Sequence, residues 1–181
     1  PRIGGVKRDL PVGFADRARA KIKLFENRIN EYEMMLDEST IWLVRLQGVG
    51  YARAEDMVNS GVSGPNVRAA GVNYDVRWAH PYSVYDQVDW EPAVEKPTSV
   101  KGADCYDRYR VRMEEMRQSC KMTLDALDKI PGGANTHYNT GDEMIIAKAP
   151  TRAPEGATGF SNYECTRGAS QFYIQGGGDG R

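Results

Sequence analysis

The sequence predicts a mainly helical α+β domain that contains two long packed helices, a long irregular segment and a small C-terminal hairpin. Three observations predict this class. Two windows of the chain repeat apolar residues every three or four positions, which is the helical period. The stretch between these windows is rich in glycine and proline. Two short β-prone runs near the C-terminal end flank a turn sequence.

The first window predicts a long amphipathic helix at about 14–37. Its apolar positions recur at helical spacing, while charged residues occupy the other faces: Phe14, Ala18, Ile22, Phe25, Ile29, Tyr32 and Leu36. Two shorter helices are predicted to follow at 40–47 and 53–59, because each apolar stretch is closed by glycine. Ser39 or Thr40 is the expected N-cap of the first of these.

The second window predicts a helix at about 104–127, with Asp104 as its N-cap. Its apolar stripe comprises Tyr109, Met113, Met116, Cys120, Leu124 and Leu127. We expect the two long helices to pack against each other, because each has one apolar stripe and the chain offers no other long amphipathic partner. The irregular segment 60–103 is long, and such segments are more often functional or an interface than idle linker.

The remainder of the chain is predicted to form an exposed connection and a hairpin. Residues 131–158 are polar and include Pro150 and Pro154. The run 163–165 is expected to pair with 171–175 across the turn 166–168. The chain starts at proline and ends in a glycine run that resembles a hairpin tip. We therefore expect residues 1–181 to form a single partial domain, a fragment of a longer protein.

Composition excludes several classes of function. Lys and Arg total 24 and Asp and Glu total 25, so the net charge of −1 gives no reason to expect a nucleic-acid partner. No apolar run approaches the roughly 20 residues of a membrane helix, so membrane association is expected to be peripheral. The three cysteines are far apart and form no Cys-x-x-Cys pair. Consequently we expect this segment to bind no metal or other cofactor.

A long run of residues resembles one protein family. The run 104–119 is closely similar to a signature of the D subunit of complex I, which is related to the large subunit of nickel-iron hydrogenases. Residues 64–71 with 75–77 resemble the family pattern Gly-Pro-x-x-Arg-(Ala/Gly)-Ser-Gly…Asp-x-Arg, with Ala70 where serine is usual. Further matching segments lie at 4–11 and 81–86. The match is weaker at 164–169, where Thr166 replaces proline and Ala169 replaces glutamate.

The resemblance implies a partial nickel-iron-hydrogenase-large-subunit-like fold. It implies a hydrophilic-arm subunit of a proton-pumping NAD(P)H or deazaflavin:quinone oxidoreductase, at the cytoplasmic face of the cell membrane. Such a subunit holds no redox centre. It packs on the partner that carries the terminal iron–sulfur cluster, beside other hydrophilic-arm and membrane-arm subunits, and the two form the quinone chamber. The family's quinone-contacting histidine and tyrosine precede the matched segment, so no catalytic residue is assigned here.

Nine charged residues are candidates for a polar network or an interface: Arg68, Asp75, Arg77, Asp104, Asp107, Arg108, Glu114, Glu115 and Arg117. The first three lie in glycine-rich backbone, where they would serve either quinone-coupled proton chemistry or a structural salt bridge. The acids at 104 and 107 would complement a helix dipole. Glu114 and Glu115 flank the apolar stripe, so one of them needs a partner such as Arg112 or Arg68.

Two other functions remain open on the sequence. The first is the large subunit of a membrane-bound nickel-iron hydrogenase, whose metal-binding cysteine pairs would lie near the ends of a full-length chain. The second is a decayed, non-functional copy, which the weaker match at 164–169 leaves possible. Neither the electron donor nor the quinone follows from the residues.

Overall fold

The computed structural model describes residues 10–130 and 153–177. The order of its elements is α1 (Phe14–Asp37), α2 (Thr40–Leu46), α3 (Ala54–Asn59), α4 (Pro65–Ala69), α5 (Val76–Ala79), α6 (Cys105–Asp128), β1 (Thr158–Cys165) and β2 (Gly168–Gln175). The predicted helices 14–37, 40–47, 53–59 and 104–127 are confirmed with small shifts at their ends. Among the described helices, none is long and apolar enough to span a membrane.

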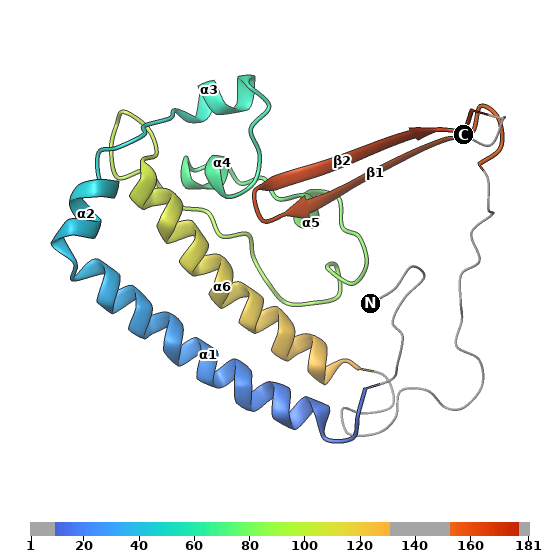
Figure 1. Ribbon diagram of the computed structural model, residues 1–181, viewed down its shortest axis with the longest axis horizontal. Coiled ribbons are helices and arrows are strands. Elements are labelled where there is room, and N and C mark those ends of the chain that lie inside the picture. Colours follow the sequence, from blue (N-terminus) through green and yellow to red (C-terminus); the bar gives the residue numbers. More distant parts are fainter. Residues whose placement is uncertain (1–9, 131–152, 178–181) are drawn as a thin grey trace.

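The long helices α1 and α6 lie side by side and run in opposite directions (Figure 1). Their contact is an apolar cluster of Ile29, Met113 and Cys120, against which Ile22, Tyr109 and Met116 pack. The predicted pairing of the two helices is therefore confirmed. The stripe predicted for the first helix was too broad, because Phe25 and Tyr32 are 43% and 47% exposed. A single neighbouring helix covers only the line of residues that faces it.

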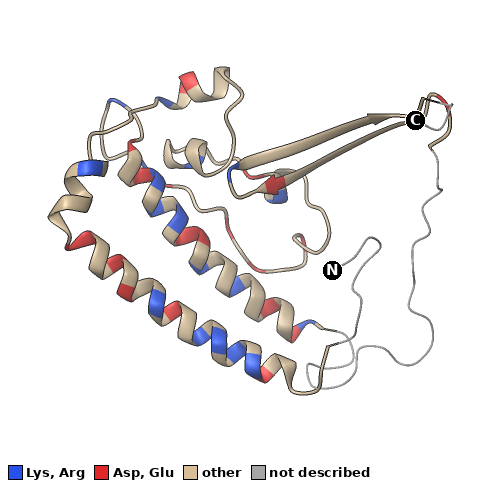
Figure 2. Ribbon diagram, viewed as in Figure 1, with Lys and Arg blue, Asp and Glu red and all other residues tan. Residues whose placement is uncertain are grey.

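The order of charges along α1 suits ion pairs with its neighbour α6 and opposes the dipole of α1 itself. The first half of the helix is mainly basic and the second half mainly acidic (Figure 2). An isolated helix prefers the reverse arrangement. The antiparallel neighbour α6 accounts for it, because Arg19 pairs with Asp128 at one end and Glu33 pairs with Arg117 toward the other. Cross-helix pairs thus compensate an unfavourable local pattern.

The other face of α6 packs against α4, so α6 lies between α1 and α4 (Figure 1). Here the core consists of small and branched side chains: Met57, Val67, Ala69, Ala70, Ala93, Ala103 and Val111. The segment predicted to be irregular, 60–103, contributes much of this core and includes the two short helices α4 and α5, which periodicity did not predict. Helices of four or five residues are too short to produce a periodic signal.

Strands β1 and β2 form the predicted hairpin, with Tyr163 opposite Ser170. Both strands extend beyond the predicted runs: the first begins at Thr158, and the second begins at Gly168 rather than 171. Gly168 pairs with Cys165, so the turn is one residue shorter than predicted. The end of the hairpin near its turn is packed against the helical body, whereas the far end projects from it (Figure 1). Phe160 and Tyr173 in the far half are 66% and 67% exposed. Most of the predicted connection 131–158, and the end of the C-terminal glycine run, lie outside the described residues.

Candidate functional site

The centre of the candidate site is Arg68, which α4 holds in the interior with 1% of its surface exposed. Its Nη1 contacts Asp75 at 3.1 Å and Glu164 at 2.9 Å, and donates to the carbonyl of Tyr74 at 3.1 Å. Its Nη2 pairs with Glu115 of α6. One guanidinium therefore connects α4, α6, β1 and the loop before α5. The sequence left Arg112 and Arg68 as alternative partners for a glutamate that flanks the apolar stripe of α6. The structure shows that the partner is Arg68.

Asp75 also binds a second arginine, Arg77. The Asp75 carboxylate caps α5 by accepting from the backbone N–H of Arg77 at 2.9 Å. It accepts from Nε and Nη2 of the Arg77 side chain at 3.0 and 2.7 Å, a bidentate pair. The Arg77 guanidinium lies 4.6 Å from the ring centre of Trp90. Burial lowers the pKa of Arg77, but the hydrogen bond and charge of Asp75 outweigh it, so the pKa lies above its ordinary value and Arg77 stays charged.

Glu164 completes the Arg68 cluster, which we define as Arg68, Asp75, Arg77, Glu115 and Glu164. Its side chain is 4% exposed. It accepts from Arg68 through one oxygen and from the backbone N–H of Val76 at 3.4 Å through the other. Its own N–H donates to the hydroxyl of Tyr82 at 3.2 Å. Sequence reasoning did not name Glu164 as a site residue, although it is the first residue of the weaker family match at 164–169.

The Arg68 cluster holds two guanidinium groups and three carboxylates, which is one negative charge in excess when all are ionised. Buried charges cost several kcal/mol each unless they are paired and hydrogen-bonded. The pairs described above meet that requirement for every carboxylate. Chemically, such an arrangement can supply a fixed field in a low-dielectric interior.

Two glycines allow the hairpin turn to approach the helical body so closely that Glu164 reaches the Arg68 cluster. A Cβ on Gly64 would lie 2.3 Å from the Cα of Gly168, and one on Gly168 would lie 2.6 Å from Oγ of Ser63. Both glycines have positive φ, 75° and 137°. Ser63 Oγ accepts from the N–H of Ala169 at 2.8 Å. The hairpin is therefore attached at its turn by backbone contact and one hydrogen bond, in addition to the Arg68 cluster.

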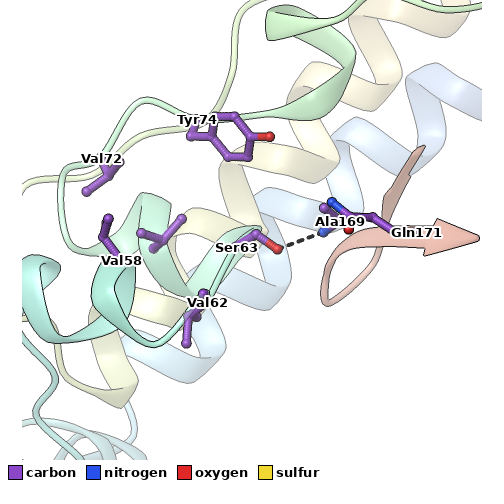
Figure 3. Close-up of a pocket in the computed structure, with 9 residues that line it drawn as sticks. Val58, Val62, Ser63, Val72, Tyr74, Ala169 and Gln171 are labelled. Carbon is purple, nitrogen blue, oxygen red and sulfur yellow. Dashed lines mark hydrogen bonds between the residues drawn. The ribbon is translucent and has the colours of Figure 1, made fainter. Parts of the chain in front are cut away.

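A pocket of about 540 Å³ opens beside this attachment (Figure 3). Its lining is mostly aliphatic: Val58, Gly61, Val62, Ser63, Val67, Val72, Tyr74, Ala169 and Gln171. Figure 3 shows the hydrogen bond from Ala169 to Ser63 at its edge. The pocket was not predicted, because its walls come from two distant parts of the chain, 58–74 and 169–171.

Asp104, Asp107 and Arg108 form a second group, at the start of α6. The two acids make a capping box, in which each side chain accepts from the other's N–H, at 3.0 and 3.1 Å. Asp104 also accepts from the N–H of Gly48, and Asp107 from the N–H of Thr98. Arg108 donates to the carbonyl of Gly50 at 2.7 Å. These contacts fasten two loops to the helix end, which favours the structural interpretation of this group.

Glu114 and Arg117 lie in a third group, toward α1. Arg117 pairs with Glu33 and donates to Asn30 at 3.3 Å. Glu114 accepts from Gln118 at 2.9 Å. The side chains of Glu114 and Arg117 are 38% and 34% exposed. The structure therefore brings together four of the nine candidates, Arg68, Asp75, Arg77 and Glu115, and separates the other five. No cluster of three or more potential metal ligands occurs among residues 10–130 and 153–177.

Comparison with known proteins identifies the family. The family model for the respiratory-chain NADH dehydrogenase 49 Kd subunit matches residues 1–181. The chain belongs to this family. One relative, the H subunit of the NAD(P)H-quinone oxidoreductase of Synechococcus sp. (strain JA-2-3B'a(2-13)), is 37% identical over 97% of the chain and 47% of its own length. Another, a D subunit of the NADH-quinone oxidoreductase of Rhizobium etli, is 42% identical over 73% of the chain and 31% of its own length.

A solved structure shares the architecture of this chain. The membrane-bound sulfane sulfur reductase, an archaeal respiratory membrane complex, contains a chain that matches with a TM-score of 0.75 and 28% identity. The match covers 97% of the present chain and 45% of that chain. The mixed architecture of helices and a small antiparallel sheet is therefore a known one. The present chain spans about half the length of the Synechococcus relative.

Proposed function

We propose that the chain is part of the quinone-site subunit of a complex I-type NAD(P)H:quinone oxidoreductase. Membership of the 49 Kd family and the names of the relatives in Synechococcus and Rhizobium support this function. We further propose that its fold is a part of the nickel-iron-hydrogenase-large-subunit type. A deazaflavin in place of NAD(P)H remains compatible with the residues.

The proposed partners follow from this function. The chain would pack on the subunit that carries the terminal iron–sulfur cluster, within a hydrophilic arm that docks on membrane-arm subunits at the cytoplasmic face. Quinone and the cluster would be bound by the assembled complex rather than by this segment. The naming of the structural neighbour as a respiratory membrane complex supports a multi-subunit, membrane-associated setting.

Within the subunit, we assign the Arg68 cluster the role of a fixed-charge element that couples quinone chemistry to proton movement. The observation that carries this role is the imbalance of three carboxylates against two guanidiniums in a largely buried setting. Glu115 has the most exposed side chain of the cluster, at 23%, and so is the member through which the cluster reaches the surface.

The test is a chimera in which residues 1–181 replace the matching part of the Synechococcus subunit. Donor oxidation with quinone is measured per assembled complex. Glu115→Gln, which keeps size and removes charge, is expected to lower turnover severalfold without loss of assembly. Glu31→Gln is the matched control, because Glu31 is 55% exposed and pairs only with its helix neighbour Arg28. Unchanged turnover in assembled Glu115→Gln complexes would show that the cluster is only structural.

The structural neighbour raises a second candidate function, because its complex is named as a reductase of sulfane sulfur. The same chimera discriminates the two, with a polysulfide offered as acceptor in place of quinone. Quinone is favoured, because the quinone-named relatives are 37% and 42% identical whereas the neighbour is 28% identical. The comparisons do not favour the hydrogenase alternative.

A further inference from the structure

Two buried hydrogen-bond donors meet where α2 faces α6, one from each helix, and neither has an acceptor among the described residues. The rings of Trp42 and Tyr109 meet edge to face, with their centres 5.5 Å apart. The indole Nε1 of Trp42 and the hydroxyl of Tyr109 are both buried, and neither has a hydrogen-bond partner in the part of the chain that the structure describes. Buried donors are almost always satisfied in folded proteins, by protein groups or by ordered water.

Carboxylates lie close to the same point. Burial, followed by the charges of Asp37 and Glu33, raises the pKa of Tyr109 to about 12, so the hydroxyl keeps its proton at neutral pH. Asp37 accepts from the hydroxyl of Tyr106 at 3.1 Å, and Tyr106 stacks at an angle on Tyr109 with centres 5.6 Å apart. The two unsatisfied donors therefore lie near the carboxylates of Asp37 and Glu33 but do not hydrogen-bond to them directly.

The two donors need an acceptor, and the neighbouring carboxylates favour one that can also donate. We propose that this site between α2 and α6 binds one internal water molecule, which accepts from Trp42 Nε1 and Tyr109 Oη and donates toward the carboxylates of α1. Buried waters typically make about three such bonds. A protein carbonyl could accept from both donors, but it could not donate to a carboxylate. A cation would be repelled by the positive ends of both donor dipoles.

This water would hold α2 in place. No residue of α2 is buried, so the helix has little apolar packing of its own. Its capping contact from Trp42 N–H to Ser39 is long, at 3.4 Å. A bridge from Trp42 to Tyr109 would connect α2 to the centre of α6 and to the end of α1. The water would therefore help to hold α2 against the α1–α6 pair.

The sign of a stability change tests the proposal. If the water is present, Tyr109→Phe breaks a hydrogen bond and lowers the folding equilibrium constant of the full chain about fivefold to tenfold, as measured by urea unfolding. If the hydroxyl is unsatisfied, the same change removes a buried polar group and raises the constant. Tyr173→Phe is the control, because Tyr173 is 67% exposed, and it should change little. A stabilised Tyr109→Phe would overturn the proposal.

The proposed water can also be observed directly, without relying on the stability of variants. In NMR spectra of the unmodified chain, the Trp42 indole proton should show a cross-relaxation peak with a long-lived water. In Tyr109→Phe that peak should weaken or disappear, because the water loses a partner. Replacing Trp42 site-specifically with benzothienylalanine, which has the same shape but no N–H, should make a second Tyr109→Phe change nearly neutral. A Trp42 proton without a water peak, or full additivity of the two changes, would contradict the site.

Discussion

Helix α6 joins its two neighbours by opposite means. Toward α4 and the hairpin it contributes Glu115 to buried ion pairs, in which the side chains of Arg68 and Glu164 are only 2% and 4% exposed. Toward α1 it contributes an apolar stripe, and its ion pair lies at the margin, with Arg117 and Glu33 34% and 33% exposed. The first contact depends on buried carboxylates that share Arg68 as their cation, whereas the second depends on buried apolar area with charges as a supplement.

The difference shows that a salt bridge has no fixed contribution to stability. A buried pair is strongly destabilised when one partner is removed, because the other charge stays in the interior. An exposed pair contributes about 0–1 kcal/mol, because water and salt already stabilise both ions. The same chemical pair therefore specifies geometry on one side of α6 and adds little on the other.

The largest effect is expected from Arg68→Met, which leaves three carboxylates without their shared cation. The loss of stability should be about 3–5 kcal/mol in urea unfolding, or the chain should fail to fold at all. Arg28→Met is the control, since Arg28 is 51% exposed and pairs only within α1. A loss below about 1 kcal/mol for Arg68→Met would mean that the buried cluster behaves like a surface pair.

Gly168→Ala is expected to come next, at about 2–3 kcal/mol, because the new Cβ meets Ser63 and the backbone has a strongly positive φ. The effect should be local and detach the hairpin turn from the body, which faster amide hydrogen exchange at Ala169 would report. Gly159→Ala, in the same hairpin, is the matched control, because nothing lies within 4 Å of a Cβ there. Equal effects at both glycines would show that close approach is not what attaches the hairpin.

Asp104→Ala should cost about 1–2 kcal/mol, the range of a good N-cap. The upper part of that range is expected, because Asp104 also accepts from Gly48 and so holds a loop against the helix. Ser39→Ala at α2, whose capping bond is 3.4 Å long, should cost less. Thermal unfolding of the two variants side by side checks the order, and the reverse order would contradict the geometry.

Arg117→Met is expected to have the smallest effect, below about 1 kcal/mol, because its partner Glu33 is partly solvated. The hydrogen bond with Glu33 raises the pKa of Arg117, so the arginine stays charged throughout any practical pH range and the effect should not depend on pH. It should shrink in about 1 M salt, where screening is nearly complete. A large loss of stability that does not depend on salt would mean that the Arg117–Glu33 pair behaves like the buried pairs of the Arg68 cluster.

Local signals in the sequence were sufficient for several elements. The period of apolar residues predicted α1 and α6, and their pairing, because a long amphipathic helix has to cover one face. Asp104 was predicted as an N-cap because its side chain acts on residues within one turn. The place of the turn between β1 and β2 was predicted for the same reason, although Gly168 belongs to the second strand rather than to the turn. In each case the interaction that decides the structure lies within a few residues, or follows from a regular repeat.

The Arg68 cluster was decided by tertiary structure. The sequence named Arg68, Asp75, Arg77 and Glu115 as charged residues in need of partners, and left Arg112 and Arg68 as alternatives for the glutamate. It did not indicate that Glu164 joins them, because that contact spans 96 residues and depends on two glycines whose backbones meet. Hydrogen bonds and ion pairs between distant segments have no period and no local signature, so their partners follow only from how the helices and the hairpin pack.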